Sequence, residues 1–173
     1  MMVRGAGWFL ALCLALGVGS PPATGAEVEV PLQLQISVFR KVFSFDRTLP
    51  SGQARVVVLY GGQDRVRANS VAEAFQAAGV PAVAGSAAAL GPEAGNVIYL
   101  LPGADHAAIR KHCVSNGFLS ISGAPAMVER GEATLGLGVG GGGRTEIWVH
   151  LPRLKEEKHE LDSGLLRLAH VIR

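Results

Sequence analysis

The first apolar pattern in the chain predicts an amphipathic helix. After Pro31, which can begin a helix, apolar side chains recur at i, i+4, i+7 and i+11, and charged residues lie on another face. The spacing predicts a helix that ends near Asp46. Its aromatic side chains, Phe39, Phe43 and Phe45, are expected to pack in the core rather than around a ligand.

Two uninterrupted apolar runs then predict strands buried on both faces, at residues 56–60 and 97–101. Each run is followed by a glycine-containing turn and a helical pattern. This order is typical of parallel strands joined by right-handed crossovers, so strand–helix units are expected over this part of the chain. The other predicted elements are a helix from about Asn69 to Gly79, a strand at 80–84 and a helix from Asp105 to Val114.

The C-terminal third predicts three strands, a charged segment and a helix. Residues 118–121 indicate a buried strand, and residues 133–139 and 145–149 indicate two antiparallel strands joined by a turn at Gly140–Gly143. The segment Lys155–Glu160 is expected to be solvated because charged residues dominate it. The closing helix, capped by Asp162 or Ser163, is expected to turn four apolar residues inward: Leu165, Leu166, Ala169 and Ile172.

These elements predict an α/β fold. We expect a three-layer sandwich with a mixed, mainly parallel sheet, an antiparallel C-terminal hairpin and flanking helices. The sequence contains no recognisable internal repeat, so residues 27–173 are expected to form a single domain.

The first 26 residues have the pattern of a secretory signal peptide. Arg4 supplies positive charge, Trp8–Val18 is apolar and uncharged, and small residues follow. Cleavage is expected near Ala26, which would place residues 27–173 in the periplasm without direct membrane insertion. A retained N-terminal anchor is the alternative.

Charge and cysteine content exclude several classes of function. Lys plus Arg (16) nearly balance Asp plus Glu (14), so nothing indicates nucleic acid or an anionic membrane as a partner. Once a signal peptide is removed, Cys113 stands alone and cannot form an internal disulfide. We expect it to be buried as a small apolar side chain.

No recognised catalytic or metal-binding pattern is present. The five histidines lack ligand spacing with Cys, Asp or Glu, and Glu156-Glu157 is expected to be exposed, without the apolar surroundings that tune a general acid. Gly138-x-Gly140-x-x-Gly143 matches a dinucleotide motif in its letters, but a strand is predicted after it instead of a helix. We therefore expect no catalytic residue, cofactor or metal, and hence no enzyme.

One loop is placed where a small ligand could bind. Gly61 and Gly62 follow a buried strand and precede a helix, and parallel sheets bind ligands beyond the carboxyl ends of their strands. Backbone N–H groups with Arg65 or Arg67 could hold an anion there, although a plain solvated turn is the alternative. The loop at Pro102–His106 is expected to lie beside it. The candidate ligand-binding residues are Gly61, Gly62, Asp64 and Arg65.

Several motifs resemble those of the YfiR-like periplasmic proteins. The similar segments are Leu119-Ser-Ile-Ser-Gly123, Val128-Glu-Arg-Gly131, Thr145–Leu151 and, as the most specific, the Ser163–Ile172 helix. The Phe39–Phe45 helix stands where that family has its first helix.

The resemblance implies a non-catalytic exported domain that regulates by protein contact. Such proteins are similar to repressors that bind the periplasmic part of a membrane diguanylate cyclase and lower cyclic-di-GMP signalling and biofilm formation. A homodimer is left open. His150 stands where the family usually has Asn, and the lone Cys113 cannot reproduce a redox-responsive disulfide, so redox sensing is not expected here. The alternative function is a periplasmic small-ligand binding protein for an anion or small solute.

Overall fold

The structure, a computed structural model, describes residues 29–50, 52–87, 90–91 and 95–173. The predicted signal peptide and its cleavage site lie outside these ranges. Within them, no helix combines the length and apolar character that a membrane crossing requires.

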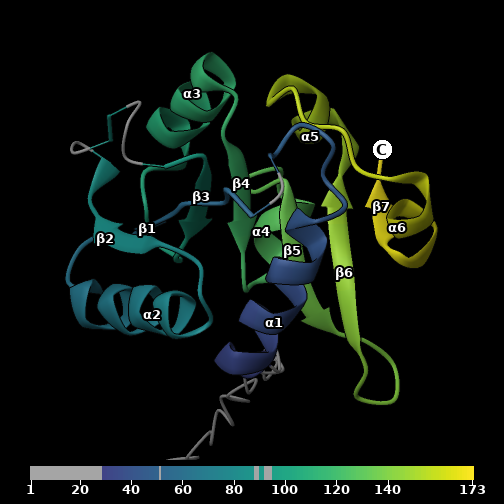
Figure 1. The fold of residues 1–173 in the computed structure, drawn as a ribbon, viewed down its shortest axis with the longest axis horizontal. Coiled ribbons are helices and arrows are strands. Elements are labelled where there is room, and N and C mark those ends of the chain that lie inside the picture. The colour runs from purple at the N-terminus through teal and green to yellow at the C-terminus, as the bar shows by residue number, and fades with distance from the viewer. Residues whose placement is uncertain (1–28, 51, 88–89, 92–94) are drawn as a thin grey trace, which may run out of the picture.

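A seven-stranded sheet with the order β2-β1-β3-β4-β5-β6-β7 organises the fold (Figure 1). All neighbouring strands pair in parallel except β5 and β6, which are antiparallel. The mixed, mainly parallel α/β sheet is therefore confirmed. The strands are β1 (Val56–Leu59), β2 (Ala82–Gly85), β3 (Val97–Leu100), β4 (Leu119–Ser122), β5 (Leu135–Val139), β6 (Thr145–His150) and β7 (His170–Ile172).

Helices cover both faces of the sheet and make two cores. One core packs residues of α1 and α2 against strand residues such as Val58 and Tyr99, and the other packs α3 and α4 against residues such as Ile98. This gives the expected three layers. The helices are α1 (Leu32–Phe43), α2 (Arg65–Ala77), α3 (His106–Asn116), α4 (Pro125–Glu129), α5 (Leu151–Glu156) and α6 (Ser163–Leu168).

The glycine-rich turn joins β5 and β6 as predicted, and a strand follows it. Gly142 and Gly143 adopt φ of 80° and 76°, a left-handed backbone that suits glycine because it lacks a Cβ. The β5–β6 hairpin projects past the ends of the neighbouring strands (Figure 1). The dinucleotide letters at Gly138–Gly143 thus lie on a hairpin and not at the start of a helix.

The predicted amphipathic helix is α1, but it ends at Phe43 rather than near Asp46. Phe39 is buried between Phe43, with ring centroids 6.4 Å apart, and Tyr99, at 6.1 Å. Phe45 was expected in the core and is 36% exposed, because the chain turns away after the helix. Similarly, α2 begins at Arg65, four residues before the expected Asn69.

The prediction that Lys155–Glu160 is a solvated segment is wrong. Glu157 is completely buried, and His159 is nearly so. His159 Nδ1 lies 2.7 Å from Asp46 Oδ2, which ties the segment after α5 to the end of α1. Burial alone would raise the pKa of Asp46, but the hydrogen bonds with His159 and Thr48 outweigh it and the pKa is lowered. Charged residues were a misleading signal here because each buried charge has a partner.

The closing helix is also shorter than predicted. Asp162 caps α6 by accepting a hydrogen bond from the backbone of Gly164, but α6 ends at Leu168. Ala169 is extended, and His170–Ile172 form β7, which pairs in parallel with β6. The hairpin therefore does not form the edge of the sheet. The β-branched Val171 and Ile172 suit a strand, a preference that the helical spacing masked.

Candidate functional site

The loops that follow β1 and β3 touch each other through their backbones. β1 and β3 are neighbours, with Leu59 paired to Leu100. A Cβ atom placed on Gly61 would lie 1.8 Å from the carbonyl oxygen of Gly103. The two loops that were expected to lie side by side do so, and only glycine at position 61 permits the contact.

The residues proposed for anion binding in the first loop are mostly at the surface. Gly61 is half-buried, whereas Gly62, Asp64 and Arg65 are exposed. Asp64 occupies the N-cap position of α2, but its side chain accepts no capping hydrogen bond. A ligand site at Gly61, Gly62, Asp64 and Arg65 stays a prediction.

The structure separates the two arginines that were considered together. Two residues along a helix are turned by roughly 200°, so Arg65 and Arg67 face different ways. Arg67 points to a hollow between the starts of α1 and α2, together with Ser70 and Val71 at the i+3 and i+4 positions. Of the two, Arg67 is the one that meets a cavity.

We call this hollow the Arg67 crevice. Its main cavity is about 380 Å³ and is lined by the starts of α1 and α2 and by Tyr99 of β3. A smaller space of about 10 Å³ adjoins it and extends to the end of β4 at Ser122–Ala124. Four residues border both spaces: Glu29, Gln35, Arg67 and Tyr99.

A fixed chain of hydrogen bonds forms the floor of the crevice. The buried Tyr99 hydroxyl donates to Gln35 Oε1 at 2.7 Å, and Gln35 Nε2 donates to the carbonyl of Val30 at 2.6 Å. Burial raises the pKa of Tyr99 to about 12, so the phenol stays protonated. A Cβ on Gly123, the residue after β4, would lie 2.6 Å from the Tyr99 hydroxyl, so a larger residue there would have to displace the floor. The floor is neutral, polar and preorganised.

An ion pair lies at the mouth of the crevice. Arg67 Nη2 donates to Glu29 Oε1 at 2.9 Å and to Oε2 at 3.0 Å. The side chains are 49% and 56% exposed, so the pair contributes only about 0–1 kcal/mol to stability. The hydrogen bond to Glu29 raises the pKa of Arg67, which carries its positive charge throughout the accessible pH range. Arg67 is thus a permanent cation at the opening of a polar cavity.

This arrangement suits binding rather than proton transfer. The guanidinium can recognise a carboxylate or another planar anion, and the floor offers fixed polar groups beneath it. Among the described residues, no group of three or more His, Cys, Asp or Glu is placed to hold a metal ion. Sequence reasoning named Arg67 but missed Glu29, Gln35 and Tyr99. The one available signal was Gln35, a polar residue next to the apolar face of a predicted helix.

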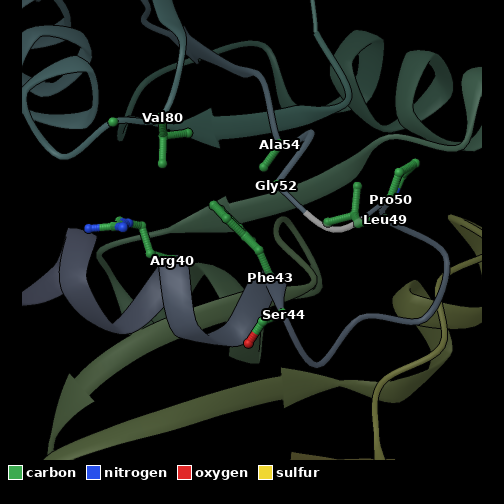
Figure 2. A pocket seen from close by; sticks show the side chains of 9 residues that line it. Arg40, Phe43, Ser44, Leu49, Pro50, Gly52, Ala54 and Val80 are labelled. Atoms are coloured by element: carbon green, nitrogen blue, oxygen red, sulfur yellow. The ribbon is translucent and has the colours of Figure 1, made fainter.

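A second hollow of about 180 Å³ lies at the opposite end of the sheet, between α1 and the chain before β1. Figure 2 shows Phe43 pointing from α1 toward the gap between Ala54 and Val80, while Arg40 extends to the side. The hydroxyl of Ser44 is already engaged with the Lys41 carbonyl. Few polar groups converge here, so this hollow offers a ligand fewer hydrogen-bonding partners than the Arg67 crevice does.

A third hollow is an apolar groove of about 550 Å³ between α1, β6 and α6. Phe45 and the 83% exposed Leu168 border it, and among the described residues that line it Lys41 alone is charged. We call it the apolar groove. Its surface suits contact with apolar side chains and not recognition of a polar solute.

No protein-family model matches the sequence, and no curated protein matches it. Solved structures do resemble the fold. An ABC domain from Streptococcus pneumonia, in complex with L-Trp, has a TM-score of 0.59 and 12% identity over 82% of this chain and 60% of that one. A conserved domain protein from Vibrio cholerae has a TM-score of 0.55 and 13% identity over 85% of this chain and 61% of that one. The chain thus spans about three fifths of either neighbour, and the likeness extends to the α/β fold.

Proposed function

We propose that this protein binds a small ligand carrying a carboxylate or a similar anion in the Arg67 crevice. The observation that carries the proposal is the placement of a permanent cation at the mouth of a cavity of about 380 Å³ with a fixed polar floor. Cavities of a few hundred Å³ with few, well-placed polar groups are typical of small-molecule sites.

The position of the crevice in the sheet supports this function. The chain passes from β1 to β2 on one side and returns to β3 on the other, so the strand order reverses between β1 and β3. Open α/β sheets bind ligands at such a point, beyond the carboxyl ends of the strands. Arg67 lies at the start of the helix that follows β1, and Tyr99 lies near the carboxyl end of β3. The fold shared with a domain that was solved with L-Trp bound also favours a small organic ligand.

Replacing Arg67 is expected to abolish most of the binding. Amino acids and small carboxylates would first be screened by thermal shift, and the best ligand would then be titrated by calorimetry. Arg67→Met keeps the length of the side chain but removes a charge-assisted hydrogen bond of about 1.5–3 kcal/mol, so Kd should rise about 10- to 100-fold.

Arg65→Met is the matched control. It removes the same charge from an exposed residue that lies two positions before Arg67. Its Kd should stay within about twofold of the wild-type value. Loss of binding in Arg65→Met but not in Arg67→Met would instead place the ligand at Gly61–Arg65. A screen without any response would contradict a ligand-binding function.

The apolar groove favours a second candidate function, that of an exported regulatory module of the YfiR-like kind. In this proposal the groove contacts the periplasmic part of an inner-membrane signalling protein, such as a diguanylate cyclase. The part of the lining that the structure describes contains Lys41 and no acidic residue, so the complementary surface would be apolar with an acidic group at its rim. Exposed apolar side chains gathered at a groove are typical of protein-contact sites.

Leu168→Glu should disrupt this contact. A charge at an 83% exposed side chain costs the folded monomer little, but a buried unpaired carboxylate in an interface is costly. Crosslinking in cells followed by mass spectrometry should recover a membrane signalling protein with the wild type and not with Leu168→Glu. Val66→Glu, at a 78% exposed position on α2, is the control and should retain the crosslink. Equal recovery with both variants would argue against the groove.

A further inference from the structure

The ion pair at the mouth of the Arg67 crevice joins two segments that are distant in the sequence, the chain before α1 and the first turn of α2. We infer that Glu29 is an internal competitor for the ligand, so that a ligand carboxylate displaces the Glu29 carboxylate from Arg67. This inference rests on the proposed ligand-binding function and adds its regulation. Its basis is the geometry of Glu29, Arg67 and Val30.

Glu29 presents to Arg67 the same chemical group that the proposed ligand would present. Both of its oxygens accept hydrogen bonds from a single nitrogen, Nη2 of Arg67. A guanidinium prefers to bind a carboxylate through two parallel N–H groups, and Glu29 does not use that mode. A free carboxylate that enters the cavity can therefore make a better-matched pair with Arg67 than Glu29 does.

Displacement of Glu29 is inexpensive because both partners are half exposed. Their side chains keep 56% and 49% of their accessible surface, so water already solvates much of each charge. Exposed pairs of this kind shift an equilibrium by no more than about fivefold. Glu29 therefore weakens ligand binding by a small factor and does not prevent it.

The contacts beside Glu29 do not depend on its carboxylate. Val30 is buried, its carbonyl accepts the hydrogen bond from Gln35 Nε2, and the carbonyl of Pro31 accepts from the Gln35 backbone N–H. These contacts belong to the floor of the crevice and remain when Glu29 leaves. The displacement is thus confined to the Glu29 side chain.

The test compares two probes that differ by one group, L-tryptophan and indole-3-propionate, which lacks the ammonium. Both would be titrated by calorimetry into the wild type and into Glu29→Gln, a variant that keeps the shape of the side chain and removes its charge. If Glu29 competes with the ligand, both probes should bind Glu29→Gln about two- to fivefold more tightly than they bind the wild type.

Glu73→Gln is the control for the overall change in charge, because Glu73 is exposed on α2 and does not line the crevice. It should leave both affinities unchanged. Weaker binding of L-tryptophan alone to Glu29→Gln would show that Glu29 holds the ammonium, and would overturn the inference. Unchanged affinity for both probes in Glu29→Gln, with loss in Arg67→Met, would overturn the inference but leave the ligand-binding function standing. If neither probe bound the wild type or any variant, the inference would also be overturned. The ligand-binding function itself is judged by the thermal-shift screen of amino acids and small carboxylates.

Discussion

Glu157→Gln is expected to destabilise the protein by about 3–5 kcal/mol, because it removes the buried carboxylate that pairs with the buried Arg153. Arg153 is 1% exposed and donates to Glu157 Oε1. Ser120 Oγ donates to the same oxygen at 2.6 Å, while its backbone N–H and Thr134 Oγ1 donate to Oε2. An amide can accept on one side only, so the variant loses the charge and turns an N–H₂ group toward donors.

The loss would be measured by urea unfolding followed by circular dichroism. Glu156→Gln is the control, since Glu156 also pairs with Arg153 but is 39% exposed, and it should cost less than about 1 kcal/mol. The double variant Arg153→Met/Glu157→Leu removes both charges and should recover only part of the stability, because the Ser120 and Thr134 donors lose the acceptor at Glu157. An equal loss in the Glu156 and Glu157 variants would contradict this account. Burial raises the pKa of Glu157, and Arg153 and the hydroxyl donors oppose that rise.

Gly61→Ala is expected to cost about 3 kcal/mol or more, because its methyl group has no space. The Cβ would lie 1.8 Å from the Gly103 carbonyl oxygen and 2.4 Å from its carbon. Both are backbone atoms, so no rotamer change can relieve the clash, and the two loops must move apart. Thermal and urea unfolding would measure the loss.

Gly141→Ala provides the comparison. Gly141 lies in the β5–β6 turn, and a Cβ there would meet no atom within 4 Å. Its stability should change by less than about 0.5 kcal/mol. If both alanine variants unfold at the same urea concentration, the loops after β1 and β3 do not pack as closely as described.

The elements that the sequence predicted well are those whose cause is local. The uninterrupted apolar runs at β1 and β3 became buried parallel strands because only a strand covered on both faces tolerates such a run. Asp105 caps α3 by accepting from the Ala108 N–H, and Cys113 is fully buried, where burial raises the pKa of its thiol. In each case a residue and its near neighbours carried the information.

The errors came where two local signals competed or where distant partners decided. Residues 163–172 fit a helical spacing, but Val171 and Ile172 gain more by pairing with β6 than by continuing α6. Charge predicted exposure for Glu157, yet Arg153, Ser120 and Thr134 compensate its burial. The sequence could not show that these partners converge, because they come from three separate elements.

By itself, then, the sequence determined the α/β class, the hairpin and the capped starts of α3 and α6, since these depend on periodicity, glycine and capping within a few residues. Only the tertiary structure decided that Glu29, Gln35, Arg67 and Tyr99 surround one cavity. They come from the chain before α1, from α1, from α2 and from β3, and the packing of α1 and α2 against the sheet brings these segments together. A site formed by packing leaves no spacing in the chain, because its geometry arises from contacts between elements and not from the order of residues within them.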